Sequence, residues 1–157
     1  SHDQNYSFAA MTDAWNEAGI GQVMVEPVSS DAVENYGVAD LGGEVGEPFK
    51  SIPLKGLVEK PSPKDAPSNL AVLGRYILPS KVLELLETIV AGVGGEIQLT
   101  DALDELLKLD ELNTFETDAD IFDCGNKQGF LSANLVVGMR DPDARKYIKA
   151  LIEKSGW

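Results

Sequence analysis

Short runs of apolar, largely β-branched residues alternate with amphipathic segments along the first half of the chain, and this alternation constrains the fold more than any other feature. Its spacing predicts a helix over 7–18 and strands over 22–28, 36–41, 52–59 and 70–78. The last two strands are separated by a loop with three prolines in seven residues, which rules out a regular element there. Strands that alternate with helices are typical of an α/β fold.

Helices dominate the second half of the sequence. We expect a helix capped by Ser80, a second helix after the glycines at 92–95, and one or two short strands over 114–122. Two further helices are predicted, one over 126–139 and one that starts at Asp141-Pro142 and turns inward Tyr147, Ile148, Leu151 and Ile152. At 157 residues, the chain is expected to fold as a single domain over 1–157.

The chain carries 13 Lys and Arg residues against 26 Asp and Glu residues, a formal net charge of −13. Nucleic-acid binding relies on clustered cations that meet phosphates, so this balance argues against a nucleic-acid partner. It also argues against an anionic membrane surface, and no apolar run approaches the roughly 20 residues that a spanning helix needs. We therefore expect neither nucleic acid nor membrane among the partners.

Cysteine and histidine are scarce, with one of each, Cys124 and His2. A lone cysteine cannot form an internal disulfide, which fits a reducing compartment, so we expect a cytoplasmic protein. The counts also exclude a Cys/His zinc site and any Ser-His-Asp or Cys-His apparatus. Without a histidine to activate it, Cys124 is expected to be a packed, small apolar residue. Any chemistry must use carboxylates, lysines or backbone groups, with or without a hard metal such as magnesium.

Two strand ends carry candidate binding groups. Val58-Glu59-Lys60-Pro61 ends a predicted strand with an acid beside a base, where the carboxylate could accept sugar hydroxyl hydrogens and the ammonium could neutralise a phosphate. From residue types alone, a charged strand end exposed to water is the favoured alternative. Tyr36-Gly37-Val38 begins another strand, where a glycine lets a ligand approach the backbone closely because it has no Cβ. A plain turn before a strand is the alternative there.

Two further motifs lie at helix starts. Asp123-Cys124-Gly125-Asn126 falls between a strand and a helix, where an Asp can cap the helix or offer an oxygen to magnesium. The segment 94–101, GGEIQLTD, opens an earlier helix, and its Glu96 complements the helix dipole. Each motif is unspecific by itself, but their order along the chain is specific.

In that order, the segments 36–38, 58–61, 68–76, 94–101 and 123–127 resemble those of bacterial UTP–glucose-1-phosphate uridylyltransferases, members of the sugar-nucleotide pyrophosphorylases. The resemblance runs from about Phe8 to about Lys154, and its most specific blocks are APSNLAVLGRY and GGEIQLTDAL. It implies an α/β fold: the C-terminal part of a Rossmann-like, glycosyltransferase-A-type nucleotidyltransferase, with a mixed sheet and flanking helices.

In these enzymes the phosphate of glucose 1-phosphate attacks the α-phosphate of UTP, giving UDP-glucose and pyrophosphate with magnesium. Such a transfer needs charge neutralisation and alignment rather than a covalent nucleophile, which fits a chain without a catalytic histidine. The resemblance implies two catalytic residues, Lys60 on the sugar phosphate and Asp123 as one of two Mg²⁺ ligands. It also implies a set of sugar contacts: the side chain of Glu59, the backbone of Gly37 and Val72, and Tyr36 close by.

The chain departs from the family at its beginning. Family members start with a glycine-rich loop that holds the nucleotide triphosphate, and residues 1–7 contain no such loop. The second metal ligand and the uracil-reading residues also lie upstream in the family. We therefore expect a truncated portion that is inactive alone and that forms a homo-oligomer. Two alternatives are a non-catalytic sugar-phosphate-binding or assembly module, and a thymidylyl- or adenylyl-transferase relative that acts on glucose 1-phosphate.

Overall fold

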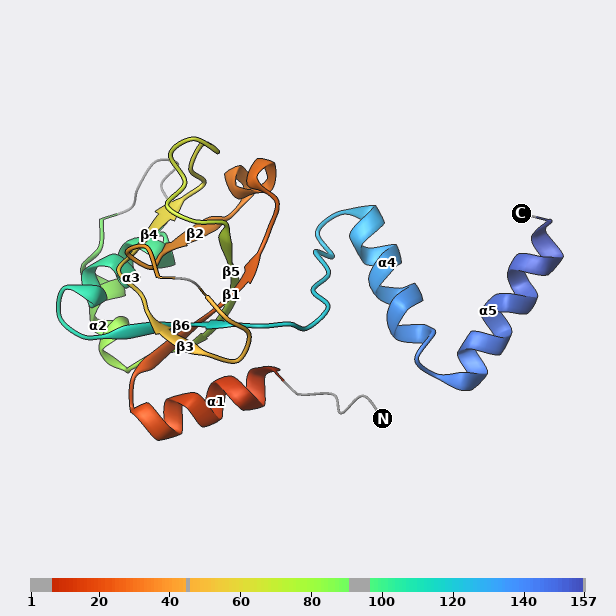
Figure 1. Cartoon of the computed structure of the whole chain (residues 1–157), viewed down its shortest axis with the longest axis horizontal. Coiled ribbons are helices and arrows are strands. Elements are labelled where there is room, and N and C mark those ends of the chain that lie inside the picture. The colour runs from red at the N-terminus through yellow and green to blue at the C-terminus, as the bar shows by residue number, and fades with distance from the viewer. Residues whose placement is uncertain (1–6, 45, 91–96, 157) are drawn as a thin grey trace. The chain divides into compact units, whose positions relative to one another are not determined.

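The computed structural model describes residues 7–44, 46–90 and 97–156, so the glycines at 92–95 and the predicted role of Glu96 lie outside the described residues. The chain divides into two compact units, 1–119 and 120–157, and each is described by itself. The helices are α1 (Ser7–Ala18), a 3-10 helix η1 (Ser30–Asn35), α2 (Lys81–Thr88), α3 (Leu99–Leu107), α4 (Lys127–Gly138) and α5 (Pro142–Ser155). The strands are β1 (Gly21–Pro27), β2 (Gly37–Asp40), β3 (Ser51–Pro53), β4 (Gly56–Glu59), β5 (Leu70–Ile77) and β6 (Leu112–Glu116) (Figure 1).

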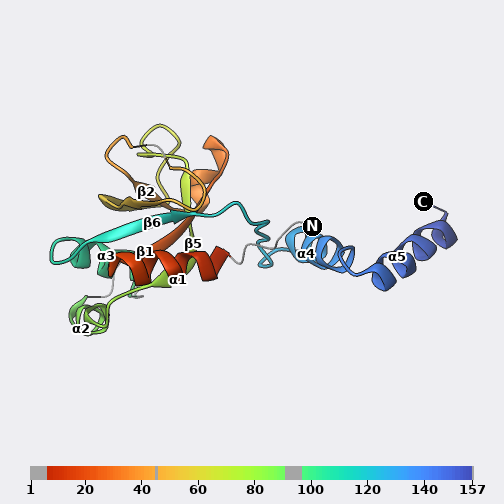
Figure 2. The same ribbon diagram turned by 60° about the horizontal axis from the view of Figure 1, so that its bottom comes forward.

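The first unit is built on one six-stranded sheet with the order β3-β6-β1-β5-β2-β4. β1 and β6 run parallel, and the other neighbouring pairs run antiparallel. α1 packs against β1 and β5 (Figure 2), while α2 and α3 pack on each other and α3 also packs on β4. The predicted mixed sheet with flanking helices is therefore confirmed.

The predicted strand over 52–59 is wrong, because the chain forms two strands that lie at opposite edges of the sheet. Only Leu54 and Lys55 separate them, and the Leu54 N–H donates to Leu112 O while the Lys55 N–H donates to Asp40 O, both at 2.8 Å. Strands lie about 4.8 Å apart, so the edges of a flat six-stranded sheet would be about 24 Å apart. Two linking residues span at most about 11 Å. The sheet therefore curls until its two edges meet at this corner.

The main core lies on the face of the sheet that α2 and α3 cover. Val23 and Val25 of β1 belong to it, together with Leu103 and Leu106 of α3 and Leu57 of β4. Because successive strand side chains point to opposite faces, Met24 and Phe115 lie on the other face, and both are buried. Buried Met11 comes from α1. The sheet therefore carries buried apolar side chains on both of its faces.

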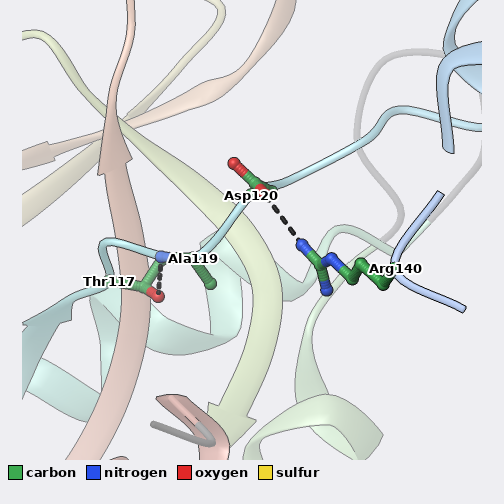
Figure 3. Close-up of polar contacts among 4 residues, drawn as sticks. All are labelled: Thr117, Ala119, Asp120 and Arg140. Carbon is green, nitrogen blue, oxygen red and sulfur yellow. Dashed lines mark hydrogen bonds and ion pairs between the residues drawn. The ribbon is translucent and has the colours of Figure 1, made fainter. Parts of the chain in front are cut away.

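β6 ends at Glu116, so of the one or two short strands predicted over 114–122 only the first three residues are in a strand. The hydroxyl of Thr117 accepts a hydrogen bond from the Ala119 N–H at 3.1 Å (Figure 3). A Thr side chain that bonds the backbone two residues on forms a local turn, which competes with the ladder of the sheet. The segment that follows is therefore irregular rather than a strand.

The second unit contains α4 and α5. The Asp141 carboxylate accepts from the Ala144 N–H at 2.7 Å, with Pro142 in the first turn, so the predicted start of the last helix is confirmed. The prediction that its apolar residues face inward is wrong for three of the four: Tyr147, Leu151 and Ile152 are exposed, Tyr147 by 70%. Within the described residues, no helix is long and apolar enough to cross a membrane.

Two smaller predictions also need correction. Ser80 does precede α2, but its backbone is helical and, among the described residues, its hydroxyl makes no capping hydrogen bond. Cys124 is exposed rather than packed. α4 is capped by Asn126 rather than by Asp123.

Candidate functional site

Three predicted site residues lie side by side in one row across the sheet. Glu59 of β4 is the direct partner of Gly37 in β2. The β2–β5 ladder contains the pair Val38–Ala71, so Gly37 and Val72 are the next residues on their strands. Directly opposed residues in a sheet point to the same face. The row therefore presents the Glu59 and Val72 side chains on either side of a glycine that has none.

The carboxylate of Glu59 occupies the space above this glycine. A Cβ atom on Gly37 would lie 3.1 Å from Oε2 of Glu59, 3.6 Å from Cγ2 of Thr100 and 4.0 Å from Cβ of Val72. Glu59 remains exposed, so its oxygens can accept hydrogen bonds from a ligand. Because Gly37 has no side chain, its backbone lies directly beneath the Glu59 carboxylate.

Lys60 follows directly and has an unusual backbone. Its φ is +46°, a left-handed conformation that is rare for a residue other than glycine. Its N–H donates to Tyr36 O at 3.0 Å, which continues the β2–β4 ladder one residue beyond the Gly37–Glu59 pair. Such strained residues cluster at ligand-binding sites, where the surrounding structure over-determines them. The Lys60 side chain is exposed, beside the carboxylate of Glu59 in sequence.

Two residues that sequence reasoning did not assign also belong here. Thr100 contributes the methyl group described above, from the first turn of α3. Burial raises the pKa of the Tyr76 hydroxyl, and the charge of Glu59 raises that pKa further. In the β1–β5 ladder Val72 is opposite Val25 and Tyr76 is opposite Val23, so both lie on the face of the main core although the register shifts between them. Their even spacing along β5 could have identified Tyr76. No comparable signal indicated Thr100, whose position depends on how α3 packs.

Asp123 belongs to the second unit and is held by two hydrogen bonds. Its Oδ1 accepts from the Gly125 N–H at 2.9 Å, and its Oδ2 accepts from Nδ2 of Asn126 at 3.0 Å. The helix cap is Asn126, whose Oδ1 accepts from the Gly129 N–H at 2.8 Å. Asp123 therefore orients the residue that caps α4 instead of capping the helix itself.

The first turn of α4 lies tightly against this loop. A Cβ atom on Gly129 would overlap the carbonyl oxygen of Asp123. Asp120, before the loop, pairs with Arg140 beyond the end of α4 at 2.8 Å (Figure 3). Both side chains of this pair are half exposed, so it contributes little to stability. Gly129 is the contact that sets the position of Asp123 relative to α4.

The donor set at Asp123 suits magnesium. Over the part of the chain that the structure describes, Asp123 takes part in no ion pair, and no three His, Cys, Asp or Glu side chains gather as a metal site. Mg²⁺ keeps several waters and is usually held by one or two carboxylates plus phosphates. An exposed carboxylate that accepts two hydrogen bonds and keeps free lone pairs fits this role.

A separate cavity of about 790 Å³ lies at α2 and α3 and is lined by Lys55, Asp101 and Asp104 among others. Burial is the main cause that raises the pKa of Asp104, whose Oδ1 accepts from the Leu57 N–H at 3.2 Å. Tyr36, Gly37, Glu59, Lys60 and Val72 are not among the residues that line this cavity. The cavity is therefore distinct from the row over Gly37.

Comparisons with known proteins agree with this geometry. Residues 2–138 match the protein family described as Nucleotidyl transferase. The chain is 44% identical over 147 residues to a UTP–glucose-1-phosphate uridylyltransferase of Haemophilus influenzae, with 94% of this chain and 50% of the relative covered. It is 40% identical over 148 residues to the enzyme of that name from Escherichia coli K12, covering 94% of this chain and 48% of the relative.

Solved structures give the same result. The UTP-bound UGPase of Acinetobacter baumannii superposes with a TM-score of 0.83 at 38% identity, over 93% of this chain and 49% of that chain. A UDP-glucose pyrophosphorylase complexed with UDP-glucose superposes with a TM-score of 0.79 at 35% identity, over 90% of this chain and 52% of that chain. The chain spans about half the length of the curated relatives it matches.

Proposed function

The chain belongs to the nucleotidyl transferase family, and from this premise we propose that it is the sugar-phosphate-binding part of a UTP–glucose-1-phosphate uridylyltransferase. The whole enzyme would make UDP-glucose and pyrophosphate from UTP and glucose 1-phosphate. The names of the relatives at 44% and 40% identity support this substrate pair. They favour it over a thymidylyl- or adenylyl-transferase and over a non-catalytic module.

The observation that carries the proposal is the position of the Glu59 carboxylate over Gly37, directly before Lys60. Glu59 accepts hydrogen bonds from hydroxyl groups of the glucose ring, and charge-assisted bonds of this kind are about twice as strong as neutral ones. The backbone groups of Gly37 and Val72, at the end of the β2–β5 ladder, bind the same ring. Tyr36 lies close by and holds Lys60 through its carbonyl oxygen.

Lys60 binds the phosphate of glucose 1-phosphate. The hydrogen bond from the Lys60 N–H to Tyr36 O holds the backbone from which this side chain extends, directly after Glu59. A sugar phosphate that is held by its ring and by its phosphate is oriented for attack, and such positioning supplies much of the catalysis in phosphoryl transfer.

Asp123 would be one of two ligands to Mg²⁺. The metal would supply charge neutralisation on the phosphates. The role of this chain is to present one carboxylate oxygen whose direction is set by Gly125 and Asn126. Because the donor set described above is small, the remaining coordination would come from water, phosphate oxygens and the second ligand.

Self-association and a cytoplasmic location are part of the same proposal, as is a single sugar-phosphate-binding domain over 1–157. Exposed apolar side chains on α4 and α5, among them Leu131 and Leu151, support self-association. Light scattering over a wide concentration range should give a mass above 16.9 kDa. A monomer at every concentration would contradict this part of the proposal.

Isothermal titration of the chain with glucose 1-phosphate tests the proposed site. Wild type should bind, and Lys60→Ala should bind roughly 10- to 100-fold more weakly, since a charge-assisted contact is worth roughly 1.5–3 kcal/mol. Lys64→Ala removes the same charge from an exposed position in the next loop and is the matched control. Equal loss of affinity in both variants, or no binding by wild type, would overturn the proposal.

The activity of the chain itself gives a second test. With UTP, glucose 1-phosphate and magnesium, we expect pyrophosphate release at background, because this chain spans only about half the length of the relatives that carry the enzyme's name. Turnover near that of a relative of full length would contradict the expectation.

A further inference from the structure

β4 carries the proposed sugar contact Glu59 at the edge of the sheet, with Lys60 directly after it. The strand is last in the sheet order, so it pairs with β2 on one side and, among the described residues, has no strand on the other. The outward N–H groups of such an edge strand need partners from elsewhere in the chain. The position of Glu59 therefore also depends on what holds the outer side of β4.

A carboxylate of α3 occupies this outer side. N–H groups along a strand alternate in direction, and the Lys60 N–H points to β2, where it donates to Tyr36 O. The Leu57 N–H therefore points away from β2, and it donates to Oδ1 of Asp104 at 3.2 Å. Asp104 thus supplies the acceptor that a further strand would supply, two residues before Glu59.

Both partners of this hydrogen bond are anchored in the core. Leu57 is the buried residue of β4, and α3 packs on this strand. On α3, the buried side chains of Leu103 and Leu106 lie on either side of Asp104 in the sequence. Close-packed interiors contain few voids, so α3 cannot shift freely. Asp104 therefore ties the edge strand to a helix that is itself fixed.

The carboxylate of Asp104 is half-buried, which costs solvation that an apolar side chain would not lose. Burial is the main cause that raises the pKa of Asp104, and the hydrogen bond from Leu57 acts in the opposite direction. A leucine at this position would avoid the cost but would leave the Leu57 N–H without its acceptor. The hydrogen bond to β4, rather than packing, is what the carboxylate contributes here.

We propose that Asp104 is a positioning residue of the sugar-phosphate site: it accepts from the Leu57 N–H, holds the outer side of β4, and so sets where the Glu59 carboxylate lies over Gly37. This inference rests on the proposed function, since it assumes that Glu59 binds the sugar. Asp104 itself lines the separate cavity at α2 and α3, so it acts through β4. Because hydrogen bonds weaken steeply with distance, a shift of the strand by about 1 Å would weaken the contact between Glu59 and a sugar hydroxyl.

Three substitutions separate the acceptor of Asp104 from its charge. Asp104→Leu and Asp104→Ala both remove the acceptor, and the alanine does so without adding a large apolar side chain. Asp104→Asn removes the charge and keeps an acceptor oxygen. Glu105→Leu is the matched control, because it removes a carboxylate from the same cavity, where Glu105 is exposed and pairs with Lys108. Melting curves confirm that each variant is folded.

The readout is the dissociation constant for glucose 1-phosphate, measured by titration calorimetry well below the melting temperature. Asp104→Leu and Asp104→Ala should bind about 5- to 10-fold more weakly than wild type, within the range of couplings between neighbouring residues. Asp104→Asn and Glu105→Leu should stay within about twofold of wild type. In the free chain, amide hydrogen exchange at Leu57 should be faster in Asp104→Leu and Asp104→Ala than in Asp104→Asn.

A double-mutant cycle tests whether Asp104 acts through Glu59. In a Glu59→Ala background, Asp104→Leu should change the affinity by less than about twofold, because the group that it positions is gone. A merely structural role would lower stability without moving the dissociation constant of the folded chain, or would lower the affinity equally in both backgrounds.

Failure takes two distinguishable forms. If wild type binds glucose 1-phosphate and Asp104→Leu and Asp104→Ala bind it equally well, the inference alone is wrong. The same holds if Asp104→Asn is as weak as Asp104→Leu, or if the loss persists in the Glu59→Ala background. If wild type does not bind glucose 1-phosphate, the proposed function fails and the inference fails with it.

Discussion

Gly37 lies directly opposite Glu59 in the β2–β4 ladder, and the carboxylate of Glu59 covers the glycine. The same ladder pairs Asp40 with Gly56 three residues further along β2. There a Cβ atom on Gly56 would meet only the Cβ of Asp40, at an ordinary 3.9 Å. A side chain would therefore be crowded at Gly37 and would fit at Gly56.

This difference gives a paired substitution. Gly37→Ala places a methyl group 3.1 Å from Oε2 of Glu59, so the carboxylate must move and the sugar floor is filled. We expect the affinity for glucose 1-phosphate, measured by titration calorimetry, to fall at least 10-fold, while Gly56→Ala stays near wild type. Similar affinities in the two variants would show that the space over Gly37 is not the sugar site.

The left-handed backbone of Lys60 allows its charge and its strain to be separated. Lys60→Gly and Lys60→Ala both remove the ammonium group, so both should weaken phosphate binding. Glycine tolerates a φ of +46° without the steric cost of roughly 1–2 kcal/mol that other residues incur. Urea unfolding should therefore give Lys60→Gly a free energy of unfolding about 1 kcal/mol above that of Lys60→Ala. Equal free energies of unfolding in the two variants would mean that the left-handed backbone at residue 60 carries no steric cost.

Two alanine substitutions in α4 should have opposite effects. Gly129→Ala forces the first turn of the helix away from the Asp123 carbonyl, and it should lower the helix content measured by circular dichroism. Gly138→Ala meets Ile148 at an ordinary 3.7 Å and should stabilise the helix by about 0.5–1 kcal/mol. Gly129→Ala should also weaken magnesium binding, measured by calorimetry. A stabilising Gly129→Ala would contradict the packing at Asp123.

Glu116 makes stability depend on pH. It is only 9% exposed, and burial, followed by the charge of Glu47, raises the pKa of its carboxyl. A raised folded-state pKa gives stability that is present at acidic pH and is lost as the pH rises through that pKa. Glu116→Gln should therefore raise the urea midpoint at pH 7 and leave it nearly unchanged at pH 4. Exposed Glu111→Gln is the control, and equal midpoints at pH 7 for wild type and Glu116→Gln would refute the assignment.

The sequence predicted those parts of the fold that depend on local patterns. Alternation of apolar residues identified β1, β2 and β5 to within about two residues at each end, the usual uncertainty of element boundaries. Asp141 and Pro142 identified the start of α5, because both the cap and the fixed φ of proline are local effects. The grouping of Gly37, Glu59 and Val72 followed from the family resemblance, and the sheet register then placed them in one row.

What the sequence could not give depends on distant parts of the chain. The break between β3 and β4 arises because Leu54 pairs with Leu112 and Lys55 pairs with Asp40, two partners that local periodicity cannot reveal. Asp123 looked like a cap, but Asn126 caps the helix because Gly129 lets the first turn approach the Asp123 carbonyl. Thr100 was missed because the packing of α3 on β4, rather than its own sequence neighbourhood, brings it to Gly37.

The most direct test of the sugar-phosphate site is a nuclear magnetic resonance titration of the ¹⁵N-labelled chain with glucose 1-phosphate. The account predicts that the largest amide shift changes map to Gly37, Glu59, Lys60, Val72 and Thr100, and that they disappear in Lys60→Ala at the same ligand concentration. Shift changes confined to the α2–α3 cavity or to α5, or no changes at millimolar ligand, would contradict it.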